Sequence, residues 1–237
     1  MSDPVPTVTE SERRRVSELL SALRTPLDAV IAPTSAIMTE RFVDEFQSRL
    51  LAQHVFLGNP LYQDSFDRAF IAAAEIAGFA VSEAPKGQRF WDVSLDGKKI
   101  SLKSTKARSL SRNSLHFSKL TEAAWIQDCR TAKHRHERTL GLFANYCDEV
   151  DEIVQLRYFE TEATYELVGI PVALFRQILD LPISEFQADG PSIKIPVGKT
   201  PPDFTLKLDR SDAKITIANI LTVNCTIHGR WILPLTP

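Results

Sequence analysis

The chain has 237 residues, of which 43% are hydrophobic and 24% are charged, a composition typical of a folded globular protein. Its formal net charge of −2 means that any affinity for nucleic acid must come from local clusters of basic residues. The three cysteines, Cys129, Cys147 and Cys225, are too scattered for a CxxC pair, which argues against a disulfide framework and a zinc site. No apolar stretch approaches the roughly 20 residues of a membrane span, and residues 1–15 lack the apolar core of a signal peptide. These features predict a cytoplasmic protein without membrane contact.

The first 58 residues are predicted to form a helical arm. Apolar residues at helical spacing predict one helix over residues 10–24 and a second over about 36–54. His54 lies on the apolar stripe of the second helix, where a histidine at the core boundary is more common than a ligand. The arm ends at Gly58-Asn59-Pro60, because glycine and proline interrupt helices.

A third helix is predicted over about 61–77, with Phe66 and Phe70 on its apolar face and Gly78 as its C-terminal stop. Asp67 borders this apolar face instead of lying on the opposite, fully solvated side. A helix directly before a pair of strands can place one acidic side chain over their site. The alternative is that Asp67 simply faces water.

Residues 90–107 predict a β-hairpin, because apolar and polar residues alternate on both sides of Asp96-Gly97, a dipeptide that favours a two-residue turn. Counting outward from the turn gives three pairs that share one apolar face: Leu95 with Lys98, Val93 with Ile100, and Trp91 with Leu102. The opposite face then carries Asp92 directly across from Ser101 and diagonal to Lys103.

A carboxylate beside a lysine on paired strands is suited to phosphodiester hydrolysis. Asp92 can hold a divalent cation, and Lys103 can orient a water molecule or neutralise charge on the phosphate. The alternative is a solvated strand face on which the two side chains merely form an ion pair. The hairpin by itself does not decide between the two.

Residues 98–119 contain seven basic residues, six serines and no Asp or Glu. This run begins at the hairpin and favours a surface that contacts phosphates, although a solvated charged face is the alternative. It leads into a short strand predicted at residues 115–120 and a helix over about 119–137. Residues 140–146 form a continuous apolar segment, which is typical of a buried central strand.

The last third of the chain mixes strands with one helix. Its predicted elements are strands at residues 156–160 and 165–171, a helix at 171–181 and a hairpin over 204–217. The closing segment contains His-Gly-Arg-Trp at 228–231, which either ends a core strand or directs hydrogen-bond donors toward DNA.

The pattern of elements from residue 61 onward is helix, three strands, helix and strand, with Asp92 on the first hairpin strand and Ser101-Leu102-Lys103 on the second. It resembles the core of the PD-(D/E)xK nucleases. Several stretches, in order along nearly the whole chain, are more closely similar to type II restriction endonucleases of the SmaI kind: residues 41–54, 65–70, 91–107, 115–119, 156–159, 165–171 and 225–231.

The resemblance implies an α/β fold with a restriction-endonuclease-like core, that is, a central mixed sheet flanked by helices. It also implies a single domain over residues 1–237 in three parts. These are an N-terminal helical arm at 1–58, a nuclease core at 59–146, and a strand-rich C-terminal part at 147–237 that completes the sheet and contacts DNA.

Carried over by position, the resemblance assigns catalysis to Asp67, Asp92, Ser101 and Lys103. Asp92 corresponds to the metal-binding aspartate, Lys103 to the motif lysine, and Asp67 to the acid supplied by the preceding helix. The implied cofactor is Mg²⁺, held by Asp67, Asp92 and the backbone carbonyl of Leu102. Ser101 stands where the motif usually has a second acid, and a hydroxyl is a poorer ligand than a carboxylate, so one-metal and two-metal sites both stay open.

The implied function is that of a Mg²⁺-dependent type II restriction endonuclease of the bacterial cytoplasm, cutting double-stranded DNA at a short, G·C-rich palindrome as a homodimer. The residues expected to contact DNA come from the basic run, a turn and the closing segment: Lys106, Arg108, Arg112, His116, Ser118, Lys119, Arg210, His228 and Arg230. Two alternatives stay open, namely a DNA-binding module that keeps the fold without cleaving, and a structure-selective repair or recombination nuclease.

Overall fold

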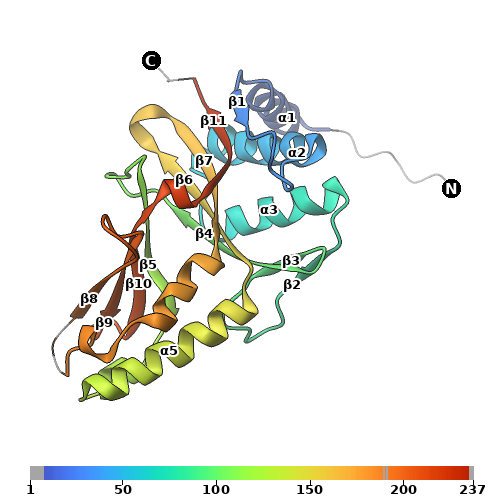
Figure 1. The fold of residues 1–237 in the computed structure, drawn as a ribbon. Helices are drawn as coiled ribbons and strands as arrows, with labels where there is room; N and C mark the ends of the chain where they lie inside the picture. The colour runs from blue at the N-terminus through green and yellow to red at the C-terminus, as the bar shows by residue number, and fades with distance from the viewer. Residues whose placement is uncertain (1–7, 189, 191, 235–237) are drawn as a thin grey trace.

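The computed structural model describes residues 8–188, 190 and 192–234, which form two β-sheets with helices packed against them (Figure 1). In the larger sheet, β4 pairs with β6 in parallel and the other neighbours pair antiparallel. Its seven strands, in spatial order, are β1 (Asp28–Ile31), β11 (Thr226–Ile232), β7 (Thr164–Pro171), β6 (Glu152–Phe159), β4 (Lys98–Thr105), β3 (Val93–Leu95) and β2 (Val81–Glu83). The prediction of an α/β fold with a central mixed sheet flanked by helices is confirmed.

One face of the large sheet is covered by three helical elements: α2 (Glu40–Leu51), the π-helix η1 (Ala52–Phe56) and α3 (Asp64–Ala77). Aromatic side chains from these helices and the sheet interlock. The Phe42 ring lies 5.4 Å from Phe70, and the Phe46 ring lies 5.1 Å from Trp231 of β11. Aromatic pairs at these separations stabilise beyond their buried area, so this core fixes α3 against the sheet.

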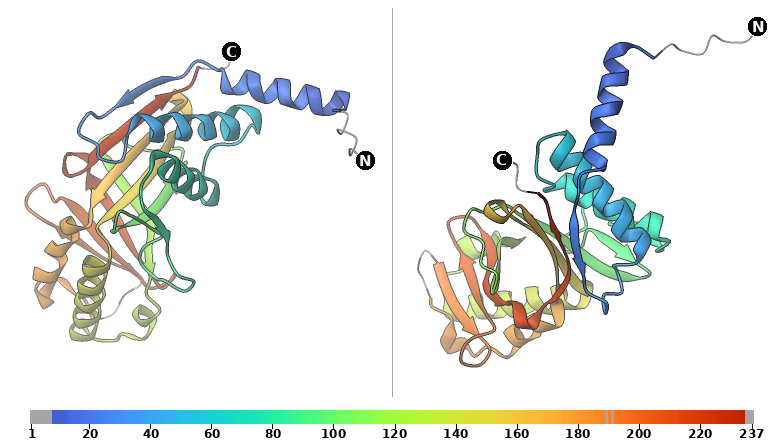
Figure 2. Two further views of the ribbon diagram at one scale, coloured as in Figure 1. Left: turned by 90° about the vertical axis from the view of Figure 1, so that its right-hand side faces the viewer. Right: turned by 90° about the horizontal axis from the view of Figure 1, so that it is seen from above.

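Helix α1 (Glu10–Leu23) projects away from the rest of the molecule (Figure 2). Its predicted bounds and those of α3 are confirmed within a few residues, whereas the second helix begins at Glu40 instead of near residue 36. None of the helices in the described part of the chain is both long and apolar enough to cross a membrane.

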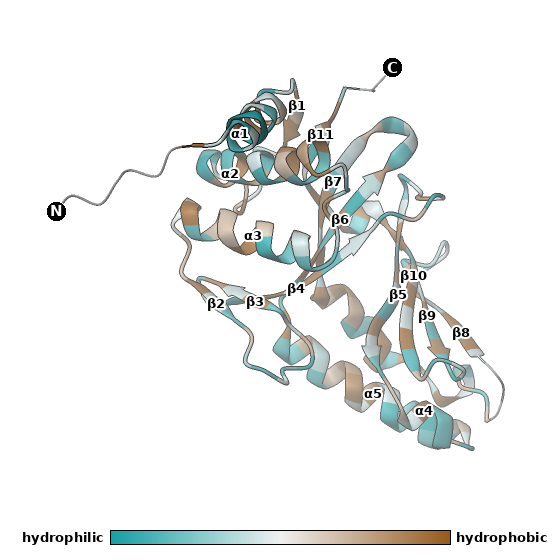
Figure 3. Cartoon of the chain, turned by 180° about the vertical axis from the view of Figure 1, so that it is seen from behind, coloured by the Kyte–Doolittle hydropathy of each residue, from teal (hydrophilic) through white to brown (hydrophobic). Residues whose placement is uncertain are grey.

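The smaller sheet has four antiparallel strands in the order β5 (Ser114–Glu122), β10 (Lys214–Leu221), β9 (Phe204–Asp209) and β8 (Ser192–Val197). This sheet, the second face of the large sheet, α5 (Ala132–Glu149) and the 3₁₀-helix η3 (Val172–Asp180) enclose a second core. Hydrophobic and hydrophilic residues alternate along β9 (Figure 3), as a strand with one buried face requires. Short helical turns complete the chain: α4 (Trp125–Asp128), η2 (Glu160–Glu162), η4 (Ile183–Glu185) and η5 (Thr222–Asn224).

The predicted hairpin forms as β3 and β4. Its turn residues Asp96 (φ 50°) and Gly97 (φ 87°) both take positive φ, as the expected two-residue turn requires. Two of the predicted pairs are present: Val93 with Ile100, and Leu95 with Lys98.

The third predicted pair, Trp91 with Leu102, is wrong. Strand β3 begins only at Val93, and Trp91 packs against the second core while Leu102 belongs to the helix-covered core. The reason lies at Asp92, whose side chain accepts the Leu102 amide (2.6 Å) that a longer β3 would have engaged through its backbone. The departure from a regular hairpin therefore occurs at the acidic residue of the predicted site.

The segment after the basic run also differs from its prediction. Strand β5 does include residues 115–120, but it continues to Glu122, so the helix predicted from about residue 119 does not begin there. Residues 140–146 belong to α5, which begins after the capping residue Thr131. Helix α5 packs on both the second core and η3, and an apolar stretch of such a helix cannot be told from a buried strand by its pattern alone.

The strands predicted in the last third are confirmed as β6, β7 and the β9–β10 hairpin, and the helix predicted at 171–181 is the 3₁₀-helix η3. Strands β6, β7 and β11 lie in the large sheet, whereas β8, β9 and β10 build the smaller one. The N-terminal part also contributes β1, which pairs with β11 at the edge of the large sheet and was not predicted.

Candidate active site

Asp92 lies where β3 gives way to the preceding loop, and its Oδ2 accepts hydrogen bonds from the Leu102 amide (2.6 Å) and the Ser101 hydroxyl (3.2 Å). The Lys103 ammonium lies 3.8 Å from the same Oδ2 and donates to the Ser101 hydroxyl (2.9 Å). The side chains of Asp92 and Lys103 are 44% and 27% exposed, so this point of the sheet is open to a ligand. The structure thus brings Asp92, Ser101 and Lys103 together.

Asp67 reaches the same point from α3. The start of this helix is tied to β4, because the Gln63 amide donates to the Ser104 hydroxyl (2.7 Å). Burial raises the pKa of Asp67 to about 6, with the charge of Asp92 as the next cause, while Lys103 acts in the opposite direction. Asp67 therefore lies beside the other acid and does not simply face water. We call Asp67, Asp92, Ser101 and Lys103 the acidic cluster.

Tyr146 of α5 lies beneath the acidic cluster, although the sequence pattern had suggested a strand at this position. It is 1% exposed, and its pKa is raised first by burial and further by the charge of Asp92. Ser101 lies near its hydroxyl and acts to lower this pKa, but the hydroxyl forms no hydrogen bond with any residue that the structure describes. A serine hydroxyl offers one donor and two acceptor positions, so Ser101, which donates to Asp92 and accepts from Lys103, keeps one acceptor position free.

A cleft of about 460 Å³ adjoins the cluster, and Lys103 is the cluster member that lines it. The other lining residues come from the β2–β3 connection and the end of β5: Gly87, Gln88, Arg89, Lys119, Leu120, Thr121 and Glu122. The site therefore lies between the two sheets and is reached from solvent along β5.

The donor chemistry of the acidic cluster fits a divalent cation. Asp67 and Asp92 supply the oxygen ligands that Mg²⁺ prefers. Burial, and after it the charge of Asp92, disfavour the ionised form of Asp67, and a bound cation would offset both effects. The Leu102 carbonyl points to the same side of β4 as its amide, which bonds Asp92. Over the residues that the structure describes, no three His, Cys, Asp or Glu side chains form a metal-binding group, so Leu102 and water would complete the ligand set.

The loop between β4 and β5 carries three of the basic residues expected to contact DNA. Lys106 and Arg108 are exposed on it. Arg112 turns back toward the large sheet, where it forms ion pairs with Glu162 and with Glu166 (3.5 Å). The loop thus presents two solvated cations and one that is anchored.

His116, Ser118 and Lys119 are exposed along β5. His116 and Ser118 line a pocket of about 350 Å³ on the outer face of the smaller sheet, together with lysines that include Lys207 and Lys214. The pKa of His116 is lowered, first by burial and then by these two lysines. Lys119 is paired with a neighbouring acid and lies in the cleft instead.

The remaining expected contacts differ in exposure. Arg210 lies half-exposed in the β9–β10 turn, and Arg230 of β11 is 40% exposed. His228 is only 4% exposed, with its Nδ1 2.8 Å from the Ser35 hydroxyl and its Nε2 3.5 Å from Glu152. This burial contradicts the expectation that His228 contacts DNA, because its ring nitrogens face the protein interior.

Two carboxylates and a lysine at the point where a mixed sheet opens, beside a cleft and a basic loop, characterise a nuclease of the restriction-endonuclease class. The family model SmaI, "Type II site-specific deoxyribonuclease", matches residues 1–233, and the chain belongs to this family. The chain is therefore a type II site-specific deoxyribonuclease, a restriction endonuclease that acts on DNA.

Two individual proteins are similar to it. The type II restriction enzyme SmaI of Serratia marcescens is 26% identical over 217 residues, which cover 85% of this chain and 83% of that protein. A solved restriction endonuclease in complex with substrate DNA overlaps 78% of each chain at 11% identity, with a TM-score of 0.38.

Proposed function

We propose that this restriction endonuclease cuts both strands of duplex DNA at a short palindrome and uses Mg²⁺ to do so. The observation that carries the proposal is the convergence of Asp67, Asp92 and Lys103 on one solvent-open point from two separate elements, α3 and the hairpin. A strand face that merely binds water has no need for an acid from a helix, and the raised pKa of Asp67 is a cost typical of functional sites.

In the proposed reaction, a water molecule attacks the phosphorus atom and one backbone P–O bond breaks. Lys103 neutralises the charge that develops on the phosphate, or orients the attacking water. Ser101 fixes the Lys103 ammonium by accepting its hydrogen bond, and the buried Tyr146 lies close to Ser101 on the side of the core. Asp67, Asp92 and the Leu102 carbonyl would hold Mg²⁺, which when bound supplies Lewis acidity toward the phosphate.

The proposed partner is double-stranded DNA, bound by a homodimer, because a palindrome presents the same phosphate environment once on each strand. Phosphate contacts are assigned to the exposed cations beside the site: Lys106, Arg108 and Lys119. His116, Ser118, Arg112, Arg210 and Arg230 remain proposed contacts of the surrounding surface. A G·C-rich site is supported by the family resemblance and by the preference of arginine for guanine.

The test is a plasmid digest in Mg²⁺, with a parallel reaction in EDTA and the apparent mass measured by light scattering. We expect discrete fragments only with Mg²⁺, and the mass of two chains. Absence of cutting at any Mg²⁺ concentration, or cutting confined to branched DNA, would contradict the proposal. A protein that cuts as a single chain would contradict the homodimer alone.

A further inference from the structure

A second row of charged residues crosses the face of the large sheet that carries Ser101 and Lys103. The register pairs Thr105 with Arg157, Arg157 with Glu166, and Glu166 with Arg230. Directly paired residues share a face, and alternate residues of one strand do as well, so this row lies on the side of Lys103. It is two residues further along β4 than Lys103, or about 6.6 Å.

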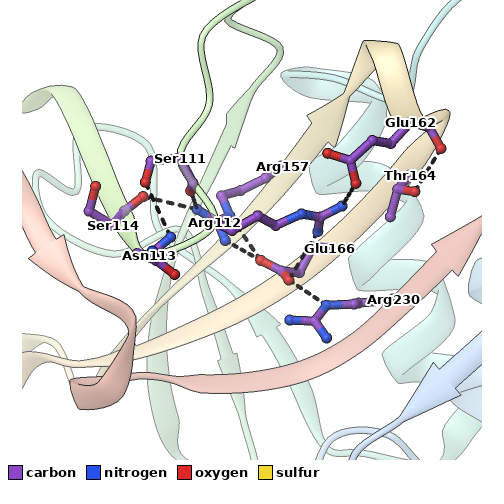
Figure 4. A network of polar contacts seen from close by, with 9 residues as sticks. All are labelled: Ser111, Arg112, Asn113, Ser114, Arg157, Glu162, Thr164, Glu166 and Arg230. Carbon is purple, nitrogen blue, oxygen red and sulfur yellow. Dashed lines mark hydrogen bonds and ion pairs between the residues drawn. The ribbon is translucent and has the colours of Figure 1, made fainter.

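The row is organised around Glu166, which is fully buried (Figure 4). Its carboxylate accepts from Arg157 Nε (3.1 Å) and Arg230 Nε (2.6 Å), and Arg112 lies 3.5 Å away. Burial alone would raise the pKa of Glu166, but the hydrogen bonds and charges of Arg157 and Arg230 lower it, so the group is ionised at neutral pH. We call Arg112, Arg157, Glu166 and Arg230 the arginine cluster.

The three arginines are not equivalent. Arg157 is 1% exposed and also donates to the carbonyls of Ser111 (2.8 Å) and Ser114 (3.1 Å), so it anchors the β4–β5 loop. The terminal nitrogens of Arg112 form ion pairs with Glu162 and Glu166. These contacts make both residues part of the scaffold.

Arg230 differs because only its Nε is engaged. Its side chain is 40% exposed, and its two terminal amino groups have no partner among the residues that the structure describes. Tethering one edge of a guanidinium fixes its plane and leaves a two-pronged donor facing outward. A group held in this way loses little conformational entropy when it binds.

We infer that Arg230 reads a guanine, donating two hydrogen bonds to O6 and N7 in the major groove. This inference rests on the proposed function. The two free prongs of the Arg230 guanidinium match the two acceptors, O6 and N7, that guanine presents side by side in the major groove. Arg230 lies three strands away from β4 in this row, about 14 Å at the usual spacing between strands, so the base that it reads lies several steps from the phosphate at Lys103.

The experiment compares cleavage of duplexes that carry each single base-pair change in the site found for the wild-type enzyme. Arg230→Ala and Arg230→Lys should each lose discrimination about 10- to 100-fold at one G·C pair per half-site and keep it elsewhere. Lysine keeps the charge but not the fork, so it rescues a phosphate contact and fails to rescue a guanine contact. Arg108→Ala, on the exposed loop, should weaken all duplexes alike.

A second measurement needs no variant. Wild-type enzyme is given duplexes with 7-deazaguanine at each guanine in turn, which removes the N7 acceptor without changing the phosphate. Cleavage should fall at least about tenfold at the position that the Arg230 variants identify. Equal loss on every duplex, full rescue by Arg230→Lys, or indifference to 7-deazaguanine would overturn the inference. A wild-type enzyme that gives no discrete fragments would instead overturn the proposed function.

Discussion

The arginine cluster and the Ser101–Lys103 part of the acidic cluster lie on one face of the same sheet, yet the charges of the two clusters are balanced in opposite ways. Glu166 is fully buried among three guanidinium groups, and two of them, those of Arg157 and Arg230, lower its pKa despite burial. Asp67 is beside a second carboxylate, and its pKa is raised to about 6. The first arrangement stabilises the fold, whereas the second stores an excess of negative charge that a cation can relieve.

The largest effect on cleavage is expected when the acid that organises the acidic cluster is removed. Asp92→Ala should lower the cleavage rate about 10³-fold or more, and Lys103→Ala should do the same, because each acts directly on the phosphate or its metal. The measurement is the initial rate of plasmid cleavage, with circular dichroism to verify the fold. Asp180→Ala, an exposed acid remote from the site, is the matched control and should cut normally. Wild-type rates in Asp92→Ala would refute the assignment.

Substitutions in the arginine cluster should mainly lower the free energy of unfolding. Glu166→Gln leaves three buried or half-buried cations around a neutral group, so the free energy of unfolding should fall by about 3–5 kcal/mol. Glu162→Gln removes another partner of Arg112, but Glu162 is 54% exposed, and the loss should stay below about 1 kcal/mol. Urea denaturation of both variants checks the difference. Similar small losses would show that Glu166 does not hold the row together.

The acidic cluster was largely predictable because its geometry is local. Asp96-Gly97 sets the turn, and the period of two then places Asp92 and Lys103 near each other without knowledge of the rest of the fold. The exact hydrogen-bond pattern between β3 and β4 was harder to predict from the sequence. The side chain of Asp92 replaces a backbone partner of Leu102, and no alternation pattern reveals such a substitution.

The arginine cluster was not predictable in the same way. Arg157 and Glu166 are nine residues apart, and their contact depends on the β6–β7 register, while Arg230 arrives from the end of the chain. Tyr146 was missed because residues 140–146 lie in a helix whose apolar stretch resembles a buried strand. Long-range pairing decides these positions, and composition carries no signal for it.

Asp67→Asn tests the excess charge directly. A carboxyl group whose pKa rises from 3.8 to about 6 favours the folded state fully below pH 3.8 and loses that contribution as the pH rises through 6. In EDTA, the variant should therefore be more stable than wild type by about 1–2 kcal/mol at pH 8, and equal to it near pH 4. Melting temperatures at both pH values check this.

The same variant should cut nearly as poorly as Asp92→Ala, since it lacks one of the two proposed metal-binding carboxylates. Mg²⁺ should raise the melting temperature of wild type more than that of Asp67→Asn. A variant that gains no stability at pH 8, or that cuts normally, would remove Asp67 from the cluster. Asp64→Asn, in the same first turn of α3, is the comparison for charge at the helix start. Because Asp64 also helps to raise the pKa of Asp67, this variant should show only a small part of the gain in stability at pH 8.

The smallest effect on activity is expected at the two hydroxyl groups beneath Lys103, those of Ser101 and Tyr146. Ser101→Ala should keep substantial activity if Asp67 supplies the acid that the motif lacks at this position. Tyr146→Phe should lower kcat about fivefold with KM unchanged, because Tyr146 touches no DNA and acts only on the position of Ser101. Tyr158→Phe, on the opposite face of the sheet, should cut at the wild-type rate.

The double variant Ser101→Ala/Tyr146→Phe decides whether the pair acts as one unit. If Tyr146 works only through Ser101, the double variant should be no slower than Ser101→Ala. It should also be more stable than Ser101→Ala by about 1 kcal/mol, because it removes a buried hydroxyl that has no hydrogen-bond partner among the described residues. Single-turnover rates of the wild type, both single variants and the double variant, measured at several pH values, complete this double-mutant cycle. Losses that multiply instead would place Tyr146 on a separate route to the acidic cluster, with the charge of Asp92 as its remaining neighbour. A dead Ser101→Ala beside an active Asp67→Asn would reverse the roles of the two residues and make the hydroxyl, not the helix acid, the second ligand.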